Sequence, residues 1–87
     1  MSYHIQNLIN LLTHHGISFN YESDYNGDHI MVNYEDRRYS IICHDFSYGH
    51  EKGLLEIYNY NWNDVCGWLT AEEVFEIIEK DIAENYI

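Results

Sequence analysis

The residues best suited to covalent chemistry in this chain are its two cysteines and six histidines. A cysteine becomes a nucleophile when an imidazole lies within hydrogen-bond reach of its thiol and a third group orients the base. Cys43 and His44 are adjacent, but they fall in an expected strand, "YSIICHDF", where neighbouring side chains point to opposite faces. The sequence therefore predicts no catalytic residue and no enzyme, and we expect Cys43 to be a buried thiol.

The histidines also raise the question of a metal site. His14 and His15 adjoin each other near an expected helix end, and His44 and His50 flank a loop. Neither pair has the helical i, i+4 spacing or the short paired spacing of zinc ligands. We therefore expect no metal and no cofactor. Surface or capping roles are more typical, and His14 and His15 suit the negative end of a helix dipole.

The group that this chain has in excess is the carboxylate. Its 87 residues include 15 Asp and Glu against four Lys and Arg, which gives a formal net charge of −11. That charge disfavours nucleic acid and anionic membranes as direct partners, and it favours a basic protein surface. Acidity that only keeps the protein soluble is the alternative interpretation.

The acidic residues fall into two groups. On the expected C-terminal helix, Glu72, Glu76 and Glu79 recur at i, i+4 and i+7, and Glu73 and Glu84 widen this row. Charges about one helical turn apart are spaced broadly like successive phosphates and could bind a basic surface, although an ordinary solvated helix face would look the same. The second group consists of turn acids at the expected hairpin ends: Asp24, Asp28, Glu35 and Asp36.

An aromatic stretch, "LLEIYNYNWNDVCGW" at 54–68, offers a different kind of surface. Alternation along a strand would turn Leu55 and Ile57 to the core and would put Tyr58 and Tyr60 on the uncovered face of the sheet. Tyrosine often anchors protein interfaces. We therefore predict partner binding at Tyr58 and Tyr60, with polar residues such as Asp64 beside them. The alternative is that these tyrosines are simply exposed on an uncovered sheet face and bind no partner.

Local patterns predict the elements that position these residues. Apolar residues at helical spacing indicate a helix over 3–15, with Ser2 as N-cap and Gly16 beyond its end. Four alternating segments indicate strands, namely "ISFNYE", "HIMVNY", "YSIICHDF" and "LLEIYNY", with a hairpin turn at Asn26-Gly27. Thr70 and Glu73 form a capping box that opens a second helix, and Trp68 and Leu69 before it are expected in the core.

These elements predict a single acidic domain over 1–87. Its class is α+β, in two layers, with a four-stranded antiparallel meander and the N- and C-terminal helices on one face, in the order α-β-β-β-β-α. The predicted core comprises Ile5, Leu8, Leu12, Phe19, Val32, Ile41, Leu55, Ile57, Val74, Ile78 and Ile82. Two isolated cysteines without a CxxC pair favour the cytoplasm.

Small size, strong acidity and helix–sheet–helix order together make the chain similar to phage-encoded anti-CRISPR proteins, in particular small DNA mimics that inhibit Cas nucleases. Locally, "YNWND" followed by "AEEVFEII" resembles an aromatic–Asn turn ahead of an acidic C-terminal helix. The resemblance implies an inhibitor whose carboxylates occupy the basic, PAM-reading cleft of such a nuclease, in the cytoplasm of a phage's host.

Two function classes therefore stay open. One is a phage or mobile-element inhibitor that binds a basic, nucleic-acid-binding surface by mimicking phosphates. The other is a non-enzymatic protein–protein interaction module, such as an immunity-type or host-takeover protein or a homodimer, that uses the Tyr/Asn sheet face. The two classes differ in the salt dependence of binding, because a phosphate mimic should lose affinity steeply as the salt concentration rises and a tyrosine-anchored interface should not.

Overall fold

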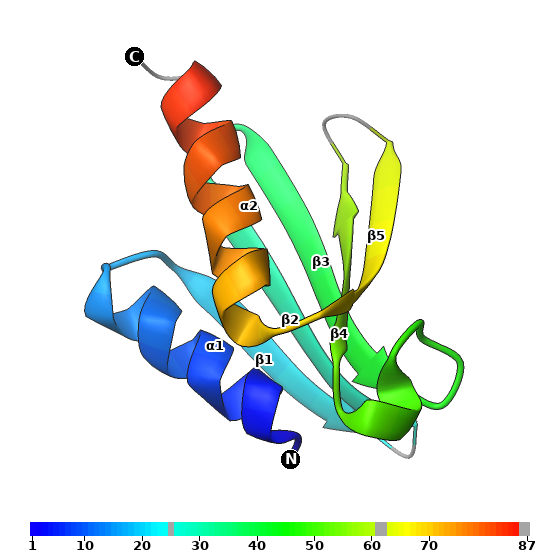
Figure 1. Ribbon diagram of the computed structural model, residues 1–87. Coiled ribbons are helices and arrows are strands. Elements are labelled where there is room, and N and C mark those ends of the chain that lie inside the picture. The colour runs from blue at the N-terminus through cyan, green and yellow to red at the C-terminus, as the bar shows by residue number, and fades with distance from the viewer. Residues whose placement is uncertain (25, 61–62, 86–87) are drawn as a thin grey trace.

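The computed structural model describes residues 1–24, 26–60 and 63–85, which form two helices and a five-stranded sheet (Figure 1). In chain order the elements are α1 (Tyr3–His14), β1 (Phe19–Asp24), β2 (Gly27–Tyr34), β3 (Arg37–His44), a 3-10 turn (His50–Lys52), β4 (Leu55–Asn59), β5 (Asp64–Leu69) and α2 (Ala71–Asn85).

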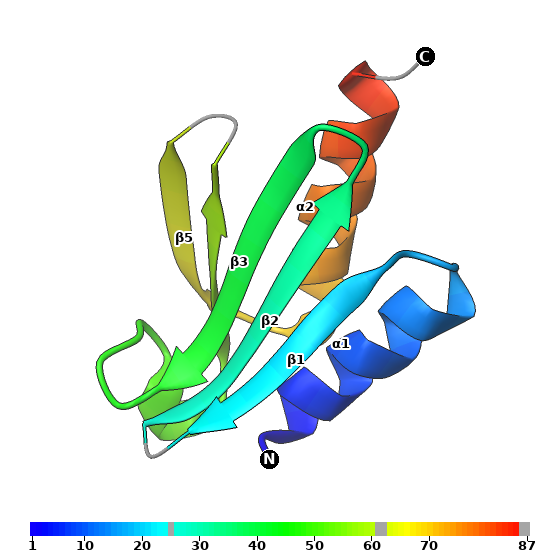
Figure 2. The same ribbon diagram turned by 180° about the vertical axis from the view of Figure 1, so that it is seen from behind.

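The sheet is a meander in which each strand pairs antiparallel with the next, in the order β1-β2-β3-β4-β5. Both helices cover one face, and the opposite face is open in the reverse view (Figure 2). The predicted α+β class and antiparallel meander are confirmed. The predicted count of four strands is wrong, because β5 adds a fifth between β4 and α2.

The sequence of β5 does not show regular alternation of apolar and polar residues, because its pairing with β4 is irregular. Ile57 lies opposite Cys66 and Leu55 lies opposite Leu69, so two residues of β5 oppose one residue of β4 between these pairs. Such a β-bulge shifts the alternation of side chains along the strand. A glycine inside the strand, Gly67, weakens the sequence signal further.

The helix ends form as predicted. The Oγ atom of Ser2 accepts a hydrogen bond from the amide of His4 at 3.2 Å, and Gly16 adopts a φ of 70° after α1. The Thr70 amide donates to Glu73 Oε1 at 2.9 Å, and the Glu73 amide donates to Thr70 Oγ1 at 3.2 Å, which completes the capping box of α2.

The first hairpin turns one residue earlier than predicted, because Asp24 pairs with Gly27 across β1 and β2 and Gly27 is therefore the first residue of β2. Gly27 has a φ of 135°, and a Cβ atom there would collide with the Cys43 carbonyl. Only glycine meets both conditions without strain.

The core lies between the helices and the covered sheet face. Nine of the predicted core residues are buried, and Phe19 and Ile82 are partly buried against them. The other buried apolar residues are Ile30, Tyr39, Cys43, Leu69, Ala71 and Phe75. The prediction that Trp68 belongs to the core is wrong, because its side chain is 50% exposed. Cys43 is a buried free thiol as expected, whereas Cys66 is exposed. Neither helix in the described part of the chain is long and apolar enough to cross a membrane.

Candidate partner-binding surfaces

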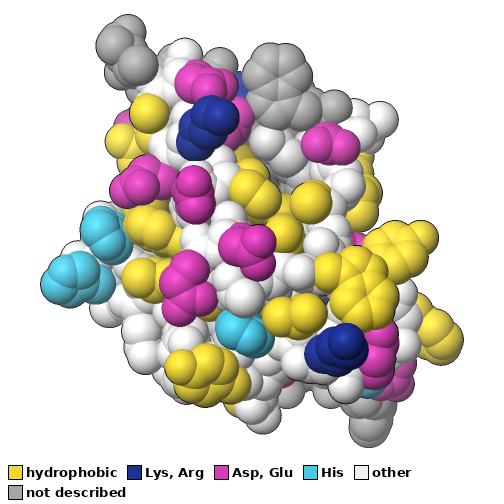
Figure 3. All heavy atoms as spheres, viewed as in Figure 1, with side chains coloured by type: hydrophobic (Ala, Val, Ile, Leu, Met, Phe, Trp, Pro, Cys, Tyr) yellow, Lys and Arg dark blue, Asp and Glu magenta, His cyan; other side chains and the backbone are white. Residues whose placement is uncertain are grey.

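Four glutamates of α2 form an exposed acidic surface, which we call the acidic row: Glu72, Glu73, Glu76 and Glu79. Val74 and Ile78, which lie between these glutamates in the sequence, are fully buried. The helix therefore has a charged side and an apolar side. Acidic side chains are accordingly visible along α2 in Figure 3, which has the viewpoint of Figure 1. At about 1.5 Å of rise per residue, the row extends roughly 10 Å along the helix axis.

A further carboxylate of α2, Asp81, points the other way. It is buried, and Arg37 of β3 binds it through three contacts: Nη2 to Oδ2 at 2.8 Å, Nη2 to Oδ1 at 2.9 Å and Nε to Oδ2 at 3.2 Å. The hydroxyl of Tyr39, on the same strand, also donates to Oδ2. This cluster anchors the C-terminal half of α2 to the sheet and leaves the acidic row facing outward.

Burial raises the pKa of Tyr39 well above its usual value, and the hydrogen bond to Asp81 adds to the rise. The folded state therefore keeps a proton that the unfolded chain releases above about pH 10. We expect the free energy of unfolding to fall above that pH, by up to about 1.4 kcal/mol per pH unit for this group. Urea unfolding between neutral and alkaline pH measures the slope. Tyr39→Phe should make the decline shallower, and an unchanged slope in that variant would contradict the assignment.

The predicted turn acids do not form one group. Asp24 is exposed at the end of β1, whereas Glu35 and Asp36 are exposed in the turn between β2 and β3. The two turns lie at opposite ends of β2, which is eight residues long and spans about 25 Å. A single flat partner site could not easily use both.

Asp28 is not a surface residue, and its predicted display to a partner is wrong. Its side chain is buried, with Oδ1 accepting from the Tyr21 hydroxyl and Oδ2 accepting from the Ser2 amide at 3.3 Å. The physical reason is strand alternation, because Asp28 precedes Ile30 by two residues and shares its inward face. The carboxylate fixes the start of α1 to β2.

Asp64 lies at the same end of the sheet as Glu35 and Asp36. It is exposed at the start of β5, and the Tyr60 amide just before it donates to the Arg38 carbonyl at 3.2 Å. That bond brings the end of β4 to the turn that holds Glu35 and Asp36. The C-terminal end of α2 reaches the same end of the sheet (Figure 1), whereas the acidic row lies mainly in the N-terminal half of that helix.

Tyr58 and Tyr60 form the predicted aromatic pair. Tyr58 is half-buried on the open sheet face, and its hydroxyl donates to Asn63 Oδ1. Its ring meets that of Tyr60 edge to face, with centroids 4.6 Å apart, and the Arg38 guanidinium lies 5.9 Å from the Tyr60 ring centre. Tyr60 is 48% exposed. The pair offers a small aromatic surface beside a positive charge.

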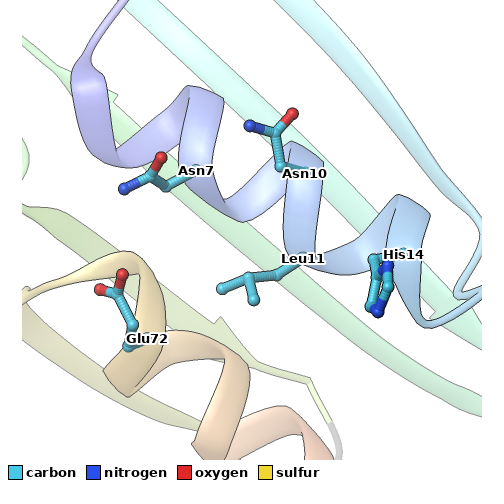
Figure 4. A pocket seen from close by; sticks show the side chains of 5 residues that line it. All are labelled: Asn7, Asn10, Leu11, His14 and Glu72. Atoms are coloured by element: carbon cyan, nitrogen blue, oxygen red, sulfur yellow. The ribbon is translucent and has the colours of Figure 1, made fainter.

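A hollow of about 440 Å³ lies between α1 and the start of α2. Asn7 and Glu72 point their polar groups toward it from the two helices, and Leu11 forms an apolar wall (Figure 4). Asn10 and His14 complete its lining. A carboxylate, amide oxygens and an apolar wall match the charged end and the aliphatic stem of a Lys or Arg side chain. The hollow therefore extends the acidic row at its first residue.

The sequence interpretation missed one exposed cluster. Phe46, Tyr48 and Trp68 come from the loop after β3 and from the bulge of β5, and we call them the aromatic patch. Phe46 and Tyr48 alternate with polar residues in a loop, which is a weak signal for exposed aromatics. The Trp68 signal was misleading, because its position before a capping box is typical of a core residue.

Within the described residues, no three or more His, Cys, Asp or Glu side chains are grouped to hold a metal ion. Comparisons with protein-family models, with curated proteins and with solved structures give no match for this chain. The likeness to anti-CRISPR proteins stays a prediction. Residues 61 and 62 of its "YNWND" segment lie outside the described residues.

Proposed function

We propose that the protein is a small acidic inhibitor that binds a basic, nucleic-acid-binding surface of a partner protein, with the acidic row in the place of phosphates. The observation that carries the proposal is the division of charge on α2. All four glutamates of the row are exposed, whereas Asp81 on the same helix is buried against Arg37. The helix has one basic residue, Lys80, so the outward charge is strongly negative.

The hollow beside Glu72 gives this surface a means of selecting its partner. One Lys or Arg side chain could enter between Asn7 and Glu72, while neighbouring cations pair with Glu76 and Glu79. The partner would then be a protein with several closely spaced basic residues. A Cas nuclease of a phage's host has such a surface in the cleft that reads the PAM, which agrees with the anti-CRISPR resemblance and with a place in the host cytoplasm.

Capture from a bacterial lysate, followed by mass spectrometry, identifies the partner. The affinity of the purified pair should then fall steeply between low and moderate salt, because exposed charge pairs are screened. A partner without a basic surface, or an affinity that does not respond to salt, would rule out the charge mimic.

A second candidate function is a protein–protein interaction module that uses the open sheet face, including a homodimer. The observation that favours it is the edge-to-face pair of Tyr58 and Tyr60 next to Arg38. Paired aromatics with a nearby arginine are typical of the residues that dominate interfaces.

Replacing Tyr58 and Tyr60 with alanine separates the two functions. If the sheet face is the interface, binding to the captured partner should weaken by about 2 kcal/mol or more, with little change in its salt dependence. Tyr3→Ala is the matched control, since Tyr3 is an exposed aromatic on α1. If the double variant binds as tightly as the control, the open face is not the interface. Sedimentation of the protein alone tests the homodimer.

A further inference from the structure

The aromatic patch exposes more apolar surface than the fold requires. Phe46 is 89% exposed, Tyr48 is 63% exposed and Trp68 is 50% exposed, so together they contribute three of the seven exposed large apolar side chains among the described residues. Hydrophobic side chains gather over the loop after β3 and over β5 in Figure 3. Contiguous apolar surface of this kind marks interaction sites more often than scattered single residues do.

The backbone under the patch is held in an unfavourable conformation. Trp68 has a φ of 61°, in the left-handed region that bulky side chains rarely adopt. It lies in the bulge of β5, and bulges next to functional sites redirect side chains. Strain of this kind clusters at sites where it serves function.

The loop and the bulge are fixed to each other. The Trp68 amide donates to the Tyr48 carbonyl at 3.2 Å, and the Tyr48 amide donates to Glu56 Oε1 at 3.1 Å. Gly67 lies directly against Tyr48, and a Cβ atom on Gly67 would collide with that side chain. The backbone segments that carry Tyr48 and Trp68 are thus held together before any partner arrives, which reduces the entropy cost of binding.

The charges near the patch indicate what covers it. Asp45, Glu51 and Glu56 come from the same loop and from β4, against one cation, Lys52. A second copy of this chain would bring another formal charge of −11 to the contact. An anionic lipid surface would be repelled in the same way. A basic protein segment complements the rim.

We propose that the aromatic patch binds an apolar side chain presented by a basic segment of the partner protein. The proposal rests on the proposed function in one respect, namely that the partner is basic. The patch and the acidic side chains of α2 are both visible from one viewpoint (Figure 3), so one partner can contact both. The acidic row then provides attraction that salt weakens, and the patch provides an anchor that salt does not weaken.

Two synthetic peptides test the proposal on the isolated protein. The first is a short amphipathic peptide of Lys and Leu, and the second has each Leu replaced by Ser, so that its charge is the same. Titration followed by amide NMR should show at least ten-fold tighter binding of the Lys/Leu peptide. The largest shifts should occur at Phe46, Tyr48, Gly67 and Trp68.

Variants show whether the patch causes the preference. Phe46→Ser with Trp68→Asn should reduce Lys/Leu binding to the Lys/Ser level, and Asn tolerates the positive φ at 68. Phe46→Ser alone should give part of this loss of binding. Because the Phe46 side chain supports no packing, this single variant should keep the fold, and misfolding is then excluded as the cause of the loss. Tyr3→Ser, at an exposed aromatic on α1, should leave the preference intact.

Each of the following outcomes would contradict the proposal that the aromatic patch binds an apolar side chain of a basic segment. Equal affinity for the two peptides would mean that charge alone attracts them, and shifts confined to α2 would place the contact on the acidic row. Concentration-dependent shifts at the patch without peptide would assign it to a second copy, and binding to zwitterionic vesicles would assign it to lipid. The proposed function fails separately, if the Lys/Ser peptide does not bind α2 even at low salt.

Discussion

Replacing Asp81 with alanine is expected to lower the free energy of unfolding by about 3–5 kcal/mol, because the change leaves the Arg37 guanidinium buried without its main counter-charge. Asp81 accepts three contacts from Arg37 and one from the Tyr39 hydroxyl. The side chains of Arg37 and Asp81 are only 13% and 8% exposed, so water replaces little of what is lost. Urea unfolding followed by circular dichroism gives the difference.

Two variants control this prediction. Glu79→Ala changes an exposed carboxylate of the same helix, and its effect should stay within about 0.5 kcal/mol. Arg37→Met combined with Asp81→Leu removes both charges and should be less destabilising than Asp81→Ala, because no charge is left buried without a partner. A loss of under 1 kcal/mol for Asp81→Ala would show that the cluster does not hold α2 to the sheet.

Replacing Glu72, Glu76 and Glu79 with glutamine is expected to weaken partner binding by about 3 kcal/mol, or roughly 100-fold, at low salt. The estimate takes about 1 kcal/mol for each charge pair that binding removes from water. Pairs that stay solvated at the edge of the interface would contribute less. The fold should be unaffected or slightly more stable, because the three side chains are exposed and like charges at helical spacing repel one another.

The matched control changes the same net charge elsewhere. Glu22→Gln, Glu35→Gln and Asp36→Asn are all at exposed positions outside α2 and outside the acidic residues next to the aromatic patch, and they also remove three carboxylates. If the acidic row is the site, this control should lose much less affinity than the α2 variant. Equal losses in the two triple variants would mean that total charge, and not the row, attracts the partner.

Local patterns predicted most of the fold. Helical spacing placed α1 and α2, alternation placed β1 to β4, and the Thr70 and Glu73 pair marked the start of α2. These features depend on residues a few positions apart, which a single sequence displays directly. β5 was missed for the same reason, since its bulge at Gly67 and Trp68 interrupts the only pattern that could reveal it.

The two buried carboxylates depend on distant partners. Asp28 was misjudged: strand alternation turns it inward, and Tyr21 and Ser2 satisfy it there, whereas Asp81, for which no prediction was made, pairs with Arg37 across 44 positions. No local pattern reports such donors, although the helical spacing of Asp81 from Ile78 indicates that it points inward. The acidic row could be predicted as a surface because exposure follows from helical periodicity alone. Its partner could not, since complementarity belongs to a second molecule.

Competition with nucleic acid tests the central proposal most directly. The captured partner is titrated with labelled nucleic acid, at low salt, in the presence of the parent protein or of the variant with Glu72, Glu76 and Glu79 changed to Gln. A phosphate mimic predicts that the parent protein and nucleic acid exclude each other, and that the variant displaces nucleic acid far less well. A partner that binds the parent protein and nucleic acid at the same time would contradict it.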